Sequence, residues 1–162
     1  MEILEHPNPA LKQTAVAVDP TTDKGLMQLV HAMATAMYEA PGIGLAATQL
    51  GVQKRVIILD IDDGLMALCN PRISELSEET EIDDEGCLSF PGVYIPIERP
   101  VSCVCEALDL KGKPVRISAE GLFARVLQHE TDHLDGMLII DRATLEERRA
   151  ALRRYREANE SR

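Results

Sequence analysis

The feature that most constrains this chain is a His-Glu-x-x-His motif formed by His129, Glu130 and His133. Two histidines four residues apart lie on one face of an α-helix, so their rings can bind a single metal ion. The glutamate between them can reach a water molecule on that ion. The motif therefore predicts a metal site on a helix over residues 121–134, which Gly136 ends. The competing interpretation is a pair of surface histidines.

A catalytic site of this type needs a third protein ligand, because water occupies the fourth position. The candidate types are cysteine, histidine, aspartate and glutamate, but no histidine follows His133, and His6 and His31 lie far upstream. Cys87 is the best candidate, since the neighbouring Gly86 lets the backbone approach closely. Glu146 and Glu147 stay open as alternatives, although they lie on a highly charged segment.

The remaining cysteines, Cys69, Cys103 and Cys105, are expected in the core. A Cys-x-Cys metal clamp is the alternative for the last two, because both point to one face of a strand. The sequence shows no secretory signal and no apolar run long enough to cross a membrane. We therefore expect a cytoplasmic protein with reduced thiols and no membrane partner.

The length of 162 residues fits one domain over residues 1–162. Hydrophobic residues make up 45% and charged residues 27%, which excludes disordered and fibrous classes. The net charge of −10 argues against DNA as a partner. An acidic run over residues 75–85 is expected to be a solvated face.

Local patterns predict the secondary structure. An apolar stripe predicts a helix that is capped within residues 21–23 and ends near residue 39. A C-terminal helix is expected from a cap at Thr144 to about residue 159. Strands are expected over residues 54–61, 65–69, 101–108 and 115–118. The fold class is therefore α+β, with a mostly antiparallel sheet packed around a central metal-binding helix and with N- and C-terminal helices.

Three segments resemble the signature motifs of peptide deformylases. They are GIGLAATQ at 42–49, EGCLS at 85–89 and QHETDHLDG at 128–136, in the family's order and at compatible spacing. The resemblance runs from about His6 to Arg142. It implies a metal-dependent hydrolase that removes the N-formyl group from the initiator methionine of nascent bacterial or organellar polypeptides, releasing formate.

The resemblance also implies the catalytic machinery. One divalent ion would be held by Cys87, His129 and His133. Fe²⁺ is the native ion implied, with Zn²⁺, Ni²⁺ or Co²⁺ also suited to thiolate and imidazole ligands. Glu130 would act as general base and then general acid. The side-chain amide of Gln49 and the backbone N–H of Leu88 would stabilise the oxyanion.

The substrate contacts follow from the same resemblance. Ile43, Gly44 and Gly86 would hydrogen-bond the peptide as an added strand. Leu122 and Val126 would line a pocket for the methionine side chain, although they are equally compatible with plain core.

Four further residues are considered near the site. Glu85 or Asp132 would orient a ligand histidine, with Arg99 as counter-ion. Tyr94 stands where many family members have an arginine that contacts the peptide, which leaves the preference beyond methionine open. The arginine-rich end, residues 142–162, is either a solvated helix or a contact to ribosomal RNA.

Two other functions remain to be weighed against a deformylase. A catalytic relative would cleave another acyl amide, and the two activities separate on formylated and acetylated peptides of one sequence. A non-catalytic metal-binding or ribosome-associated module is disfavoured, because a structural site uses four protein ligands and needs no general base.

Overall fold

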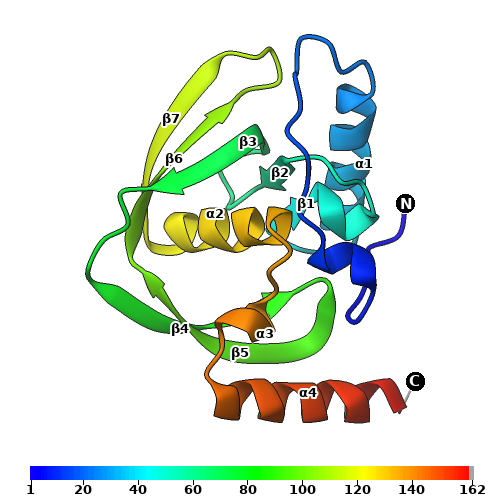
Figure 1. Cartoon of the computed structure of the whole chain (residues 1–162), viewed down its shortest axis with the longest axis vertical. Coiled ribbons are helices and arrows are strands. Elements are labelled where there is room, and N and C mark those ends of the chain that lie inside the picture. Colours follow the sequence, from blue (N-terminus) through cyan, green and yellow to red (C-terminus); the bar gives the residue numbers. More distant parts are fainter. Residues whose placement is uncertain (161–162) are drawn as a thin grey trace.

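Two antiparallel sheets organise the computed structural model, which describes residues 1–160 (Figure 1). The larger sheet has the strand order β1-β2-β3-β6-β7, and the smaller sheet pairs β4 with β5. The strands are β1 (Gly44–Ala46), β2 (Val56–Leu59), β3 (Met66–Ser74), β4 (Thr80–Cys87), β5 (Phe90–Pro100), β6 (Ser102–Leu108) and β7 (Pro114–Glu120). The fold is α+β, as the sequence predicts.

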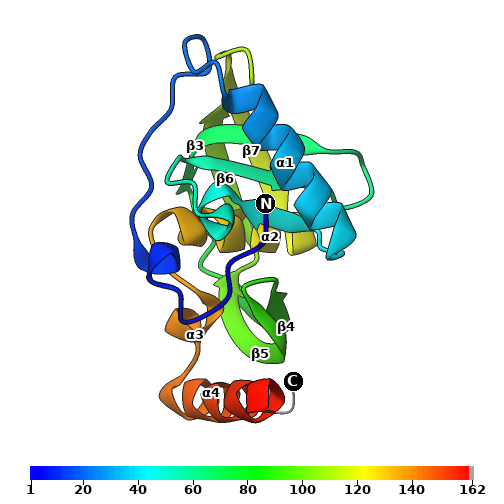
Figure 2. The ribbon, with the colours of Figure 1, turned by 90° about the vertical axis from the view of Figure 1, so that its right-hand side faces the viewer.

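Over residues 1–160, four α-helices and two short 3₁₀ helices pack against these sheets. They are α1 (Leu26–Glu39), α2 (Gly121–Leu134), α3 (Ile139–Arg142), α4 (Leu145–Glu160), η1 (Pro9–Lys12) and η2 (Ala47–Leu50). Helix α2 lies between the larger sheet and the β4–β5 ribbon (Figure 1). Helix α1 covers the opposite face of the larger sheet, and α4 packs along β5 (Figure 2). No helix among residues 1–160 is both long and apolar enough to cross a bilayer.

The apolar run of strand β2 is uninterrupted because both faces of the strand are buried. Ile57 and Leu59 pack in the core beside α2, while Val56 and Ile58 pack in the core beneath α1. A strand covered on both faces by helices loses the usual alternation of apolar and polar residues. This strand therefore packs against α1 on one face of the sheet and against α2 on the other.

Helix α1 begins later than the sequence predicts. Its apolar stripe is buried as expected, at Leu26, Leu29, Val30, Met33 and Met37. The predicted cap is wrong, because Asp23 accepts a hydrogen bond from the backbone of Gly25 at 3.0 Å and pairs with Lys54. The acidic residue therefore stabilises a turn before the helix.

The β4–β5 ribbon is the largest element absent from the predicted strands. Strand β5 contains Pro91, Pro96 and Pro100, which normally interrupt a strand. A two-stranded ribbon tolerates them, because each strand has an unpaired edge. The acidic run is exposed along β4 as expected, except that Glu85 is buried.

Helix ends and core cysteines agree with the predictions. Gly136 ends α2 with φ +75°, and its absent Cβ would meet the carbonyl of Lys12. Thr144 Oγ1 accepts a hydrogen bond from the backbone of Glu147 at 3.2 Å, which caps α4. The three cysteines that the sequence assigns to the core are all buried.

Candidate active site

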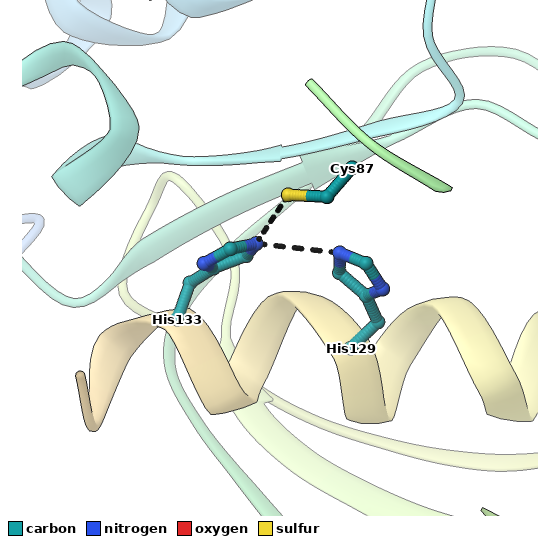
Figure 3. Close-up of side chains that lie close together, drawn as sticks. All are labelled: Cys87, His129 and His133. Atoms are coloured by element: carbon teal, nitrogen blue, oxygen red, sulfur yellow. Dashed lines mark hydrogen bonds between the residues drawn. The ribbon is translucent and has the colours of Figure 1, made fainter. Parts of the chain in front are cut away.

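Helix α2 and the end of β4 bring three predicted metal ligands together (Figure 3). Cys87 Sγ lies 3.4 Å from His133 Nε2, and His133 Nε2 lies 3.3 Å from His129 Nε2. All three donor atoms lie within 4.8 Å of one another. The alternative ligands Glu146 and Glu147 lie on α4, beyond β5 from this cluster.

The geometry of this cluster fits one metal ion. Two nitrogens bound at about 2.1 Å in a tetrahedral site are roughly 3.4 Å apart, close to the histidine separation seen here. Burial lowers the pKa of His133 well below its usual value, which favours the neutral ring that a metal requires. A thiolate with two imidazoles suits several divalent transition metals.

Glu85 orients the first ligand histidine. Its Oε1 is 2.9 Å from Nδ1 of His129, which leaves Nε2 of that ring directed at the cluster. Burial by itself would raise the pKa of Glu85, but hydrogen bonds from His129 and Arg99 hold it at about 2. The carboxylate is therefore ionised at neutral pH.

Asp132, the other predicted partner, serves a different contact. It accepts hydrogen bonds from Arg99 at 2.9 Å and from Arg142 at 2.8 Å. Asp132 thus binds Arg99, which in turn binds Glu85. Its influence on His129 is therefore indirect.

Glu130 lies at the floor of the site with one oxygen unused. Its Oε1 is buried and has no hydrogen-bond partner among residues 1–160. Burial raises the pKa of Glu130 to about 7. A Cβ on Gly44 would lie 2.5 Å from Oε2 of Glu130, so the glycine lets β1 pass directly over the carboxylate.

Gln49 points its amide group at the metal cluster. Its Nε2 donates to Ser89 Oγ at 3.0 Å and to Cys87 Sγ at 3.7 Å, while its Oε1 accepts from the backbone of Ala46 at 2.9 Å. These bonds fix the orientation of the side chain. Leu88 follows Cys87, and its side chain occupies the space that a Cβ on Gly42 would need.

A groove of about 1190 Å³ opens over this cluster. All the predicted substrate contacts line it, namely Ile43, Gly44, Gly86, Leu122 and Val126. The predicted Glu130, Gln49, Leu88, Cys87 and His129 also line it, whereas His133 is 1% exposed and lies behind them. The structure thus brings every predicted site residue to one place.

Arg125 is a residue of the site that the sequence did not predict. Its guanidinium donates to Glu85 Oε2 at 2.6 Å, to the carbonyl of Ile97 at 3.0 Å and to that of Glu81 at 2.8 Å. The available signal was its position four residues before His129, which puts both side chains on one helix face.

A Cys-His-His cluster beside a glutamate with one unpartnered oxygen among residues 1–160, on an α+β scaffold, is the arrangement expected of a metal-dependent hydrolase. The family model described as polypeptide deformylase matches residues 1–149. The chain belongs to the polypeptide deformylase family. This family removes N-formyl groups from nascent peptides, which makes its members hydrolases acting on an amide.

Individual relatives agree with this assignment. The peptide deformylase of Natranaerobius thermophilus is 48% identical over 143 residues, covering 88% of this chain and 91% of the relative. The peptide deformylase of Stutzerimonas stutzeri is 46% identical over 144 residues, covering 87% of this chain and 85% of the relative. The predictions of family and enzyme class are confirmed.

Solved structures agree as well. The crystal structure of a peptide deformylase from Legionella pneumophila has a TM-score of 0.90 at 37% identity, covering 98% of this chain and 94% of that one. A peptide deformylase from Synechococcus elongatus in complex with actinonin has a TM-score of 0.89 at 39% identity, covering 94% and 85%. The predicted fold class is confirmed.

Proposed function

We propose that residues 1–162 form one catalytic domain that hydrolyses the formyl amide of N-formylmethionyl nascent peptides in the groove over α2. The observation that carries this proposal is the convergence of Cys87, His129 and His133 beside the unused carboxylate oxygen of Glu130. A structural metal site would have no use for that oxygen.

The three ligands would hold one divalent ion, which supplies Lewis acidity and lowers the pKa of water towards about 7. Glu130 would take a proton from the attacking water and pass it to the leaving amine. Its pKa of about 7 suits both roles at neutral pH. The amide of Gln49 and the backbone N–H of Leu88 would donate to the oxyanion as it forms.

The walls of the groove would position the peptide. Backbone groups of Ile43, Gly44 and Gly86 would pair with it as an added strand, since β1 and β4 both present backbone to the groove. Leu122 and Val126 would receive the methionine side chain. Leu122 is 57% exposed, which supports a role in binding over one in the core.

We propose Fe²⁺ as the resident ion, with Zn²⁺, Ni²⁺ and Co²⁺ as substitutes that the same donors accept. Because the substrate is made on ribosomes, the proposal places the enzyme in the cytoplasm. Exposed arginines on α4, including Arg149, Arg153 and Arg156, support a contact with ribosomal RNA. Elemental analysis of anaerobically purified protein and salt-dependent cosedimentation with ribosomes test these two points.

The decisive experiment measures formate release from formyl-Met-Ala-Ser by protein loaded anaerobically with Fe²⁺. We expect rapid release, and none of comparable rate from acetyl-Met-Ala-Ser. Folded, metal-loaded protein that releases no formate would refute the proposal. Release of acetate at a similar rate would instead indicate a broader acyl amidase.

A further inference from the structure

A second cavity, of about 350 Å³, lies against a different face of the metal helix. It is bounded by residues of β3, the end of β5, α2 and α3. Gln128, Thr131 and Asp132 form its α2 wall, at a helical spacing that turns them away from Val126 and His129, which line the groove. Within residues 1–160 the two cavities share no lining residue, so this one is separate from the candidate active site.

Thr131 brings an unsatisfied hydroxyl to this cavity. The residue is 8% exposed, and its Oγ1 has no hydrogen-bond partner in the described part of the chain. A threonine inside a helix can donate to the carbonyl four residues earlier, here Leu127, but this bond is not formed. A buried hydroxyl without a partner costs stability, so a polar ligand in the cavity is expected to satisfy it.

The charged lining of the cavity has an excess of positive charge. Within the described residues its arginines are Arg55, Arg72, Arg99 and Arg142. Its carboxylates are those of Glu98, Asp132 and Asp135. Asp135 pairs with Arg55 at 3.0 Å, and Glu98 accepts a hydrogen bond from the hydroxyl of Thr80 at 2.7 Å. Four cations against three anions favour an anionic ligand.

Two of these arginines keep donors that the protein does not use. Arg142 binds Asp132 through Nε and Nη2, so its Nη1 has no partner among residues 1–160. Arg72 donates to Glu106 through Nη2 alone, at 3.2 Å, and its side chain is 71% exposed. A guanidinium presents its N–H groups in a planar fork that matches the two oxygens of a carboxylate.

Strand β3 and the loop after it add an apolar wall. Pro71, Ile73 and Leu76 line the cavity, and Leu76 is 53% exposed. The register of β3 against β6 shifts between Cys69 and Arg72, and such a bulge redirects the side chains beside it. The volume is at the lower end of the range of about 300–1,000 Å³ for ligand pockets. The cavity therefore suits a small ligand with one charged and one apolar end.

We infer that this cavity binds a small organic anion, a carboxylate on a short aliphatic chain. Arg72 and Arg142 bind the carboxylate, the hydroxyl of Thr131 donates to it, and the chain packs against Ile73 and Leu76. The inference is independent of the reaction proposed for the groove, because no metal ligand and no groove residue takes part in it.

The first test titrates hexanoate, hexanamide and acetate into Zn²⁺-loaded protein by calorimetry. Hexanamide lacks the charge and acetate lacks the chain, so each should bind at least about tenfold more weakly than hexanoate. Equal binding of hexanoate and either of the other two compounds would overturn the inference. Absence of hexanoate binding at about 10 mM would overturn it as well.

Matched variants distinguish this cavity from the metal ion, which can also bind a carboxylate. Arg72→Gln should weaken hexanoate binding by about threefold to tenfold. The control is Arg116→Gln, because Arg116 also pairs with Glu106 but does not line the cavity. The control should keep the wild-type affinity. Equal affinities of the two variants would place hexanoate elsewhere and overturn the inference.

The Thr131→Val variant tests the buried hydroxyl, since valine keeps the shape of the side chain and removes the polar atom. Without ligand, this variant should melt at or above the wild-type temperature, because the lost hydroxyl has no partner to lose. Its affinity for hexanoate should fall several-fold. A lower melting temperature together with unchanged hexanoate affinity would overturn the inference.

Discussion

At the scale of single residues, Glu130 shows how surroundings determine chemistry. The side chain is buried between α2 and β1, and burial raises its pKa to about 7. The absent side chain of Gly44 leaves room for its carboxylate. An ordinary surface glutamate would be too weak a base for the same task.

Replacing Glu130 with glutamine should lower kcat by about 10²–10⁴-fold, because the amide keeps the shape but cannot accept the proton. Metal content, measured by elemental analysis, should stay at one ion per chain. Activity within a few-fold of wild type would exclude Glu130 as the base.

Replacing Gly44 with alanine should lower kcat by about 10²-fold, because the new methyl group would displace the Glu130 carboxylate. Gly25→Ala is the matched control, since its nearest neighbour is Asp23 Oδ1 at 3.6 Å. Activity and thermal melting of both variants check this prediction. Equal activities of the two variants would contradict the assigned contact.

The four thiols should differ sharply in reactivity. Burial raises the pKa of Cys69 and of Cys105 to about 11, so both stay protonated at pH 8.5. The stabilisation from keeping these thiols neutral is complete below pH 9 and is lost as the pH rises through 11. Titration with a thiol reagent should therefore find one fast group, Cys87, in metal-free folded protein. Metal loading should protect it, and several fast groups would contradict the structure.

At the scale of elements, one buried arginine joins three of them. Arg99 on β5 donates to Glu85 on β4 at 2.6 and 3.0 Å and to Asp132 on α2 at 2.9 Å. Both partners are carboxylates with little solvent contact. This network aligns the ribbon with the metal helix.

Replacing Arg99 with methionine should destabilise the fold by about 2–3 kcal/mol, because Glu85 and Asp132 would lose its charged hydrogen bonds and keep only Arg125 and Arg142 as counter-charges. Metal affinity should also fall by about 10–100-fold as His129 loses its orientation. Arg72→Met is the control, since it removes an exposed pair with Glu106 worth less than about 1 kcal/mol. Urea unfolding and metal titration measure both effects, and equal unfolding midpoints of the two variants would contradict the role of the network.

At the scale of the whole molecule, the metal site links separate layers. Cys87 comes from the end of the β4–β5 ribbon, and both histidines come from the helix against the larger sheet. A bound ion therefore connects the two sheets through α2. Ion binding and folding stability should be coupled, because the unfolded chain cannot assemble this geometry.

Removing the metal should lower the melting temperature. An ion at 100 times its dissociation constant contributes about 2.7 kcal/mol, which corresponds to roughly 5–10 °C for a chain of this length. Calorimetry with and without a chelator measures the shift. The Cys87→Ser variant should show a much smaller shift, and an equal one would mean that the thiolate does not hold the ion.

Local sequence patterns predicted much of this fold. The stripe of α1, the bounds of α2 and the burial of Cys69, Cys103 and Cys105 follow from periodicity and residue type. The β4–β5 ribbon could not be predicted from local pattern. Its prolines normally interrupt a strand, and they are tolerated here only because each strand of the ribbon has an unpaired edge. Arg125 was missed for a similar reason, since its partners are remote in sequence.

The sequence by itself determined the ligand types, the glutamate and the helix that carries them, because residue spacing on one helix sets which side chains share a face. Only the tertiary structure decided that Cys87 meets His129 and His133, that Glu85 is buried within an acidic run, and that Oε1 of Glu130 is left without a partner among residues 1–160. Those outcomes depend on long-range packing, which removes water and brings distant charges together.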